Sequence, residues 1–353
     1  MAIGAPITSA EVVLPCADLA PALAFFTGEL GFRIETIFPA EDPHTATLSG
    51  HGLRLRLAPG SGDPGLIRIT RDGGGPETAP NGTRIEWVVS DLPVDLAEFV
   101  PEFIVTHAAD GPRAGAGRAG MVYRDLIPSR LGGRYIASHI AIPGDGPVGD
   151  WVHFHKIVFQ MIFCRRGRVR LVYEDQGEPF WMEAGDCVLQ PPRIRHSVLE
   201  SADDLEVVEV GCPALHETIA DPEMTLPTGR TLPNRDYGGQ RYGFHRAADA
   251  PWIDHDGTGF ERHETGLGLA SAGAGDARVL RPAGGDRLET GAHAGELLFG
   301  FVLAGSGALH CRGEHTLGPC DAFVIPPGEA WAVQAGADLR LLEVRSSPVG
   351  PVR

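Results

Sequence analysis

The sequence predicts a mainly β protein in which two small antiparallel β-barrels follow an α+β module. Glycine and proline, 47 and 29 of the 353 residues, recur between short apolar runs, as in chains of short strands joined by tight turns. Runs rich in valine, isoleucine, leucine and phenylalanine fill 135–210 and 277–344. Helical spacing of apolar residues occurs over 19–30. At about 100–200 residues per domain, the length fits two or three domains.

Composition and charge exclude several classes of partner. The chain is 43% hydrophobic and 22% charged, which is typical of a soluble globular protein. With 46 acidic and 30 basic residues, it lacks the broad positive field that attracts nucleic acid or anionic lipid. Residues 1–15 lack a signal-peptide pattern, and no apolar run could span a bilayer. We therefore expect a cytoplasmic protein that acts on a small-molecule substrate without nucleic acid or membrane partners, and a homodimer remains possible.

The first 107 residues predict an α+β module with the order β-α-β-β-β. Its segments are a strand at 11–18, a helix at 19–30, and strands at 32–38, 46–48, 53–57 and 66–69. This order resembles one module of the vicinal oxygen chelate (glyoxalase/bleomycin-resistance) superfamily. The residues that carry the resemblance are Val12-x-Leu14-x-x-x-Asp18-Leu19, Phe25-Phe26-x-x-x-Leu30-Gly31-Phe32 and the strands around Ser49-Gly50-His51-Gly52.

That superfamily normally closes a metal cup with paired modules, and this sequence provides only part of the pair. A second module begins at Ile85 and cannot be followed beyond Phe103. Glu11 and Glu86 lie where strand-borne ligands of the superfamily could lie, but no histidine joins them. We expect the partial module to form an interface or to cover a barrel mouth, and to bind no metal.

Glycine-rich and polar segments divide the remainder of the chain. The sequence Gly-Pro-Arg-Ala-Gly-Ala-Gly-Arg-Ala-Gly predicts a flexible link. The predicted parts are a linker at 108–133, a metal-binding barrel at 134–212, a connecting arm at 213–275 and a second barrel at 276–353.

One strand carries the residues best suited to metal binding. Residues 152–163 alternate in the manner of a β-strand, which places His153 and His155 on one face. Two inward histidines in an apolar barrel are costly unless their nitrogens find partners, and a divalent metal can satisfy both. A hydrogen-bonded or exposed histidine pair is the alternative.

The spacing beyond this strand resembles the two-part signature of the cupin superfamily, G-x5-H-x-H-x(3,4)-E-x6-G followed by G-x5-P-x-G-x2-H-x3-N. The residues that keep this spacing are His153, His155, Gln160, Gly167, Gly185, Pro191 and His196. The chain departs from the signature at Gln160 in place of Glu, at Arg193 in place of the second Gly and at Glu200 in place of Asn. The opening glycine, Gly146, is displaced by one position.

The resemblance implies a bicupin of double-stranded β-helix barrels with one divalent transition metal per chain, held by His153, His155 and His196. Gln160 would be the fourth ligand or a hydrogen-bond donor to the substrate. Fe(II) is favoured, with Ni(II), Cu(II), Mn(II) and Zn(II) as alternatives. Because Gln160 brings no negative charge, we expect the metal to favour an anionic or chelating substrate. Tyr173 and Arg134 are further candidates for acid-base catalysis or carboxylate binding, against the alternative of a solvated barrel rim.

These residues predict a metal-dependent oxidoreductase, an Fe(II) dioxygenase acting on a small enol, phenol or carboxylate. Two alternatives stay open: an isomerase or lyase that uses the metal as a Lewis acid, and a cupin that binds a small molecule without turnover. Oxygen consumption under turnover would separate the first from a dioxygenase.

The second barrel keeps the glycines and prolines of the signature but few of its ligands. His293 stands at one histidine position, Gly291 holds the other, and Trp331 occupies the place of the final histidine. One imidazole cannot hold a divalent ion, so we expect a degenerate barrel that packs on the first without binding metal.

Overall fold

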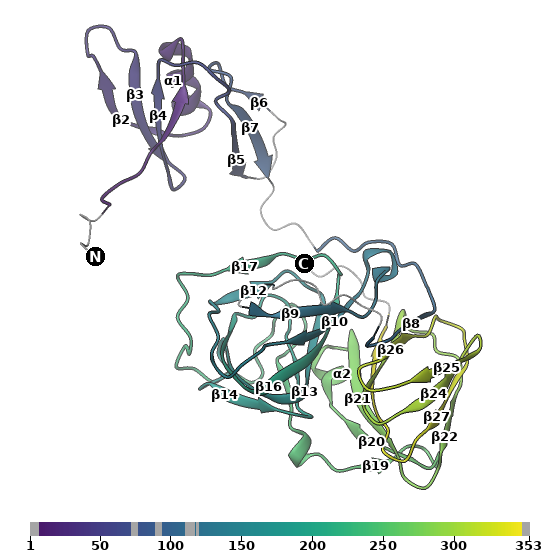
Figure 1. The fold of residues 1–353 in the computed structure, drawn as a ribbon. Helices are drawn as coiled ribbons and strands as arrows, with labels where there is room; N and C mark the ends of the chain where they lie inside the picture. Colours follow the sequence, from purple (N-terminus) through teal and green to yellow (C-terminus); the bar gives the residue numbers. More distant parts are fainter. Residues whose placement is uncertain (1–6, 72–76, 89–93, 110–116, 118–119, 348–353) are drawn as a thin grey trace. The chain divides into compact units, whose positions relative to one another are not determined.

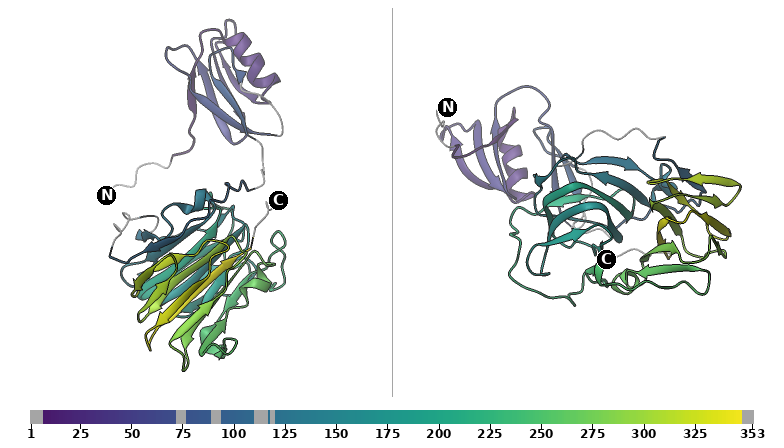
Figure 2. Two further views of the ribbon diagram at one scale, coloured as in Figure 1. Left: turned by 90° about the vertical axis from the view of Figure 1, so that its right-hand side faces the viewer. Right: turned by 60° about the horizontal axis from the view of Figure 1, so that its bottom comes forward.

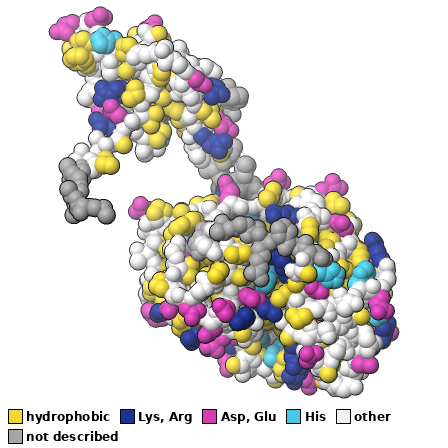
Figure 3. Space-filling view, in the orientation of Figure 1, with side chains coloured by type: hydrophobic (Ala, Val, Ile, Leu, Met, Phe, Trp, Pro, Cys, Tyr) yellow, Lys and Arg dark blue, Asp and Glu magenta, His cyan; other side chains and the backbone are white. Residues whose placement is uncertain are grey.

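The computed structural model describes residues 7–71, 77–88, 94–109, 117 and 120–347 (Figure 1). The chain forms two compact units, Met1–Leu92 and Pro93–Arg353. Strands make up most of the regular structure in both units, which confirms the predicted mainly β class. Among the helices of the described ranges, none is long and apolar enough to cross a membrane. On the face shown in Figure 3, acidic and basic side chains are interspersed.

The N-terminal unit contains the predicted β-α-β-β-β order. Its first sheet has the strand order β1-β4-β3-β2, with β1 parallel to β4 and the other neighbours antiparallel. A second sheet, β5-β7-β6, shares the same apolar core. The elements are β1 (Val12–Pro15), α1 (Leu19–Gly28), β2 (Arg33–Phe38), β3 (Thr45–Gly50), β4 (Leu53–Ala58), β5 (Leu66–Thr70), β6 (Glu77–Thr78) and β7 (Arg84–Val88).

Helix α1 follows from the spacing of its apolar residues. Leu19, Ala22 and Phe26 recur at helical intervals and are buried against the sheet. The helix ends at Gly28, and Gly31 takes a φ of +74°, which turns the chain into β2. The start of the predicted second module, Ile85, lies on β7, and residues 89–93 of that module lie outside the described residues. The relationship to the vicinal oxygen chelate superfamily therefore stays a prediction.

The two carboxylates considered as metal ligands in this unit have arginine partners. Glu11 accepts a hydrogen bond from Arg56, and Glu86 accepts one from Arg68 at 3.0 Å. Glu11 precedes β1 and Glu86 lies on β7, so the two carboxylates belong to different sheets.

The boundary between the units differs from the sequence prediction of a module at 1–107 and a linker at 108–133. Strand β8 (Ile104–Thr106) pairs with β26 (Ala322–Val324), and β9 (Val122–Asp125) pairs with β10 (Ile136–Ala141). Both segments therefore belong to the C-terminal unit, where their backbone groups complete the sheet edges. Single short strands carry too weak an alternation signal to be separated from a glycine-rich linker by sequence alone.

The first barrel is a ten-stranded sheet in which β13 and β16 form the longest antiparallel pair. It includes β17 and β18 from the predicted arm, since β17 pairs with β12 and β18 with β15. Its elements after β9 are η2 (Arg130–Gly133), β10 (Ile136–Ala141), β11 (Gly146–Pro147), β12 (His153–His155), β13 (Phe159–Tyr173), β14 (Phe180–Glu183), β15 (Cys187–Leu189), β16 (His196–Cys212), β17 (Thr218–Ala220) and β18 (Gly243–His245).

The second barrel combines a seven-stranded and a four-stranded sheet. Beside β8 and β26, its elements are β19 (Ile253–Asp254), β20 (Phe260–Glu264), β21 (Gly275–Pro282), β22 (Arg287–Thr290), β23 (Leu297–Ala304), β24 (Gly307–His310), β25 (Glu314–Leu317), β27 (Trp331–Ala335) and β28 (Arg340–Ser346), with η3 (Ala247–Asp249) and α2 (Leu267–Ala270) in the connection from the first barrel. The barrels lie side by side (Figures 1 and 2). One apolar core joins them, and it includes Phe159 of β13 and Phe299 of β23.

Candidate metal and substrate site

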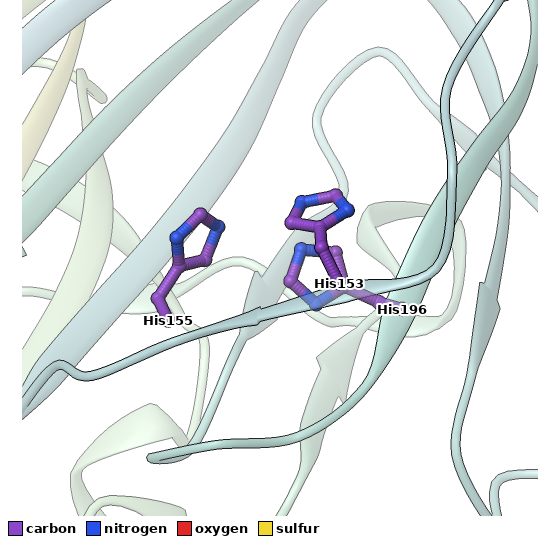
Figure 4. A group of neighbouring side chains, drawn as sticks. All are labelled: His153, His155 and His196. Carbon is purple, nitrogen blue, oxygen red and sulfur yellow. The ribbon is translucent and has the colours of Figure 1, made fainter. Parts of the chain in front are cut away.

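Three histidines of the first barrel come together at one point. His153 and His155 lie on β12, and His196 is the first residue of β16. The Cα atoms of His153 and His196 are partners in the antiparallel register, so the strand pairing itself places these two side chains together. One nitrogen from each of the three rings lies within 4.8 Å of the other two. Figure 4 shows the three rings gathered around a shared space.

The Nδ1 atoms of these rings have oxygen partners. His153 Nδ1 lies 2.7 Å from the carbonyl oxygen of Trp151, and His196 Nδ1 lies 3.0 Å from that of Ile194. Because a carbonyl oxygen only accepts, both rings carry their proton on Nδ1 and leave Nε2 as the basic atom. His155 Nδ1 lies 3.1 Å from the hydroxyl of Thr218. Outer partners of this kind orient histidines that bind metals.

The backbone explains two positions of the sequence signature. Gly167 has a φ of +70°, and a Cβ there would lie 2.5 Å from the carbonyl oxygen of Ala202, so no larger residue fits. Arg193 replaces a glycine of the signature yet keeps a left-handed φ of 63°. Its backbone N–H donates to the carbonyl oxygen of His155 at 3.1 Å, which ties the turn before His196 to the histidine strand.

The histidines line a cavity of about 260 Å³ inside the first barrel. Most of its wall is aliphatic, from inward-facing positions of β10, β13 and β16 and their neighbours; Ile140, Ile162, Leu171, Met182, Val198 and Val207 are examples. Its polar groups include Gln160, Gln190, Glu209 and His216, and no lysine or arginine of the described residues lines it. An apolar cavity with a few convergent polar groups is the usual form of a small-molecule site.

The predicted site residue Gln160 lines this cavity and contacts a carboxylate. Its side-chain nitrogen donates to Glu209 on the neighbouring strand β16. The carboxylate accepts only, so the amide oxygen of Gln160 faces away from it. That oxygen is buried, and no donor in the described part of the chain reaches it. One of the two amide N–H groups is engaged by Glu209, and the amide oxygen is an acceptor that a metal or a ligand could use.

Glu209 changes the charge balance inferred from the sequence. The expectation of an anionic substrate rested on Gln160 leaving the metal without a negative neighbour. The structure places the Glu209 carboxylate on the cavity wall, so the site has one acidic group after all. Sequence spacing missed it because the family signature ends at Glu200, earlier on the same strand. The signal that could have found it is an acidic residue at an inward position of an apolar strand, two residues after Val207.

Tyr173, predicted as a catalytic candidate, lies behind the histidines and does not line the cavity. Its ring stacks on His196 with centroids 5.5 Å apart, and its hydroxyl oxygen accepts a hydrogen bond from Gln190 at 2.8 Å. Burial raises its pKa, so it stays protonated at neutral pH. The structure therefore gives Tyr173 a packing contact with His196 from behind the cavity wall.

Arg134, the other predicted catalytic candidate, lies at the contact between the barrels. Its guanidinium donates twice to the carboxylate of Glu296, at 2.9 and 3.1 Å, and the hydroxyl of Tyr135 donates to the same carboxylate at 3.0 Å. Arg134 does not line the cavity. A lone arginine on a strand has the same sequence appearance whether it faces a cavity or a neighbouring barrel.

A second group with metal-binding atoms, His139, Glu206 and Cys320, lies between the barrels. Glu206 already accepts hydrogen bonds from Arg165 and from His139. Although burial opposes it, these neighbours hold the pKa of Glu206 below its ordinary value. The carboxylate is thus neutralised by a guanidinium, which disfavours a further cation at this point.

In the second barrel, the residues at the signature positions have structural contacts. His293 Nε2 lies 2.8 Å from the carbonyl oxygen of Ile325, and Trp331 is buried in the barrel core. Among the described residues, no group of three potential metal ligands lies within this barrel alone.

His216 is a further cavity residue that the sequence did not indicate. It lies in the predicted arm, its ring centroid is 5.3 Å from that of His155, and its Nδ1 lies 3.0 Å from the carbonyl oxygen of Pro213. No motif spacing connects it with the other histidines, because the chain reaches this position through the turn after β16.

Comparisons with known proteins support the fold. No family profile matches the sequence, and no curated protein matches it. A salicylate 1,2-dioxygenase from Pseudaminobacter salicylatoxidans has a similar fold, with a TM-score of 0.52 and 16% identity over 72% of this chain and 87% of that chain. An oxalate decarboxylase from Lactobacillus farciminis has a TM-score of 0.51 and 15% identity over 73% of this chain and 90% of that chain. Protein Ylba from E. coli has a TM-score of 0.51 and 11% identity over 73% of this chain and 97% of that chain. At these identities the likeness shows the fold alone, and that fold agrees with the predicted pair of cupin-type β-barrels.

Proposed function

We propose that this chain is a metal-dependent oxidoreductase, an Fe(II) dioxygenase that acts on a small chelating substrate: an enol, a phenol or a carboxylate. The observation that carries the proposal is the group of three imidazoles on the wall of a largely aliphatic cavity. The solved dioxygenase with the same fold is consistent with it. An oxalate decarboxylase has the same fold, so the fold does not determine the reaction and the activity needs a direct test.

The residues present fit a divalent transition metal. Two of the three imidazoles have Nδ1 bound to a backbone carbonyl, which leaves Nε2 basic and aimed at the shared space. Three neutral nitrogen ligands suit Fe(II), and Ni(II), Cu(II), Mn(II) or Zn(II) could also occupy the group. The buried oxygen of Gln160, which no donor in the described ranges reaches, is available as a fourth ligand.

The chain's own residues would do the following. His153, His155 and His196 hold the ion, which when bound would supply dioxygen activation and polarisation of a substrate oxygen. Tyr173 backs the ring of His196 and fixes its plane. The aliphatic wall excludes bulk water from the reacting groups and strengthens polar contacts inside the cavity.

Metal analysis followed by oxygen uptake tests the proposal. We expect about one transition metal per chain in the purified protein. His153→Ala, His155→Ala and His196→Ala should each lose it, while His310→Ala in the second barrel should keep it. Oxygen uptake by the iron-loaded protein should occur with at least one member of a panel of small enols and phenols. Full metal occupancy in two of the three variants would contradict the assigned site. Product formation without oxygen uptake would instead indicate an isomerase or lyase.

A further inference from the structure

The polar groups on the cavity wall include three oxygen acceptors. Gln160 and Gln190 have exposed fractions of 1% and 2%, and both line the cavity. Their side-chain nitrogens are engaged, by Glu209 and by the hydroxyl of Tyr173, while no donor of the described residues reaches either amide oxygen. Buried acceptors without donors are unfavourable, so they call for a donor from elsewhere. The Glu209 carboxylate is the third acceptor.

The second barrel provides an internal comparison for Glu209. Glu209 lies on β16, opposite Ser138 of β10. Glu343 lies at the matching place on β28, opposite Arg278 of β21. Two residues further along the same two strands, Gly211 pairs with Gln160 in the first barrel, whereas Arg345 pairs with Leu298 in the second.

The two barrels treat this glutamate differently. Glu343 is 1% exposed and receives hydrogen bonds from Arg278 at 2.8 Å and from Arg345 at 2.6 Å. At the corresponding places the first barrel has Ser138 and Gly211, which carry no charge. The negative charge of Glu209 is therefore left to the cavity, with the neutral amide of Gln160 as its protein donor.

We propose that Glu209 and the amide oxygens of Gln160 and Gln190 form a hydrogen-bond-accepting wall that selects a neutral substrate with hydroxyl donors, an enol or a phenol, and rejects a carboxylate. The inference rests on the proposed function and narrows its substrate class. A substrate hydroxyl donates to the Glu209 carboxylate, and a charge-assisted hydrogen bond of this kind is stronger than a neutral one. A substrate carboxylate at this wall would meet a like charge, and no cationic side chain of the described cavity wall offsets it. A bound divalent metal would attract the same carboxylate, so the selection by the wall is measured with the metal removed as well as with it present.

Binding of two one-ring probes tests this wall. Catechol is neutral and carries two hydroxyl donors, whereas benzoate is an anion without donors. Calorimetric titrations under nitrogen would use the protein as purified and after removal of metal. The variants are Glu209→Gln, which removes the charge at constant shape, Glu209→Asp, which keeps it, and Glu200→Gln, a matched control on β16 whose side chain is 39% exposed and outside the cavity.

We expect the wild-type protein to prefer catechol. Glu209→Gln should weaken catechol binding by about tenfold or more, the value of a hydrogen bond to a charged group, and should strengthen benzoate binding. Glu209→Asp should retain the preference for catechol, and Glu200→Gln should match the wild type. A wild-type preference for benzoate would overturn the inference, as would equal changes for both probes in Glu209→Gln.

The metal-free titration separates this inference from the proposed function. If the protein binds no metal but still discriminates between the probes through Glu209, the dioxygenase proposal fails and the accepting wall stands. If the protein binds metal and consumes oxygen but the probes bind alike in all variants, the dioxygenase proposal is supported and the accepting wall is contradicted.

Discussion

Replacing Arg134 by methionine should weaken the fold without affecting the chemistry. The arginine and Glu296 have side-chain exposures of 10% and 15%, and they join the first barrel to the start of β23 in the second. Removing one partner of a buried ion pair costs about 3–5 kcal/mol, because the other charge stays buried without compensation. Glu296 retains slight contact with water and the hydrogen bond from Tyr135, so we expect the lower part of this range, about 3–4 kcal/mol.

The double variant Arg134→Met/Glu296→Leu separates a lost contact from a stranded charge. Since it removes both charges, it should recover most of the stability lost in Arg134→Met. Urea unfolding followed by circular dichroism measures the stability, and elemental analysis with oxygen uptake measures the site. Metal content and rate should be unchanged in both variants, because neither residue lines the cavity. Unchanged stability together with a lost rate in Arg134→Met would refute the reasoning and restore Arg134 as a catalytic residue.

Three further predictions concern the site, the pH response and the unit boundary. Gln160→Glu should keep or tighten metal binding while changing the rate, because it adds a second carboxylate beside Glu209; wild-type values for both affinity and rate would show that Gln160 points away from the metal. Burial lowers the pKa of His263 below its value in the unfolded chain. The neutral imidazole therefore contributes to stability above a pH of about 6.5, and this contribution should be lost as the pH falls. Urea unfolding of His263→Gln should accordingly show a flatter pH dependence than unfolding of the wild type. Deletion of 1–92 should leave the metal content of the first barrel intact, whereas deletion of 1–133 also removes β8 and β9 and should cause aggregation through the exposed edges of β26 and β10, as light scattering would show.

The histidine group could be predicted from the sequence because β-strand geometry determines it locally. His153 and His155 share a face through the two-residue period of a strand, and the family spacing supplied His196. Glu209 and His216 could not be found in this way. Their approach to the site depends on the register between β13 and β16 and on the path of the chain after β16, and neither is encoded within a short motif.

The difference between local patterns and long-range strand pairing also explains which parts of the fold could be predicted from the sequence. Alternating apolar residues and turn-forming glycines predicted both barrels, since each long strand carries several repeats of the pattern. Strands β8, β9, β17 and β18 are three or four residues long and gain their stability from the edge that each one extends. A segment whose conformation is decided by its neighbour has little local signal, and the sequence interpretation placed β8 in the N-terminal module, β9 in the linker, and β17 and β18 in the connecting arm.

The second barrel shows what separates a binding barrel from a structural one within a single chain. A glutamate stands at matching places on β16 and β28, so its position alone does not make a site. In the second barrel Arg278 and Arg345 neutralise it, and the interior is closed by Trp331 and other apolar side chains. In the first barrel small residues replace the arginines, three histidines stand where the second barrel has Gly291, His293 and Trp331, and a cavity lies beside them. Because the half-buried carboxylate of Glu209 has acceptor positions beyond the one used by Gln160, a ligand that supplies a further donor would complete its hydrogen bonds.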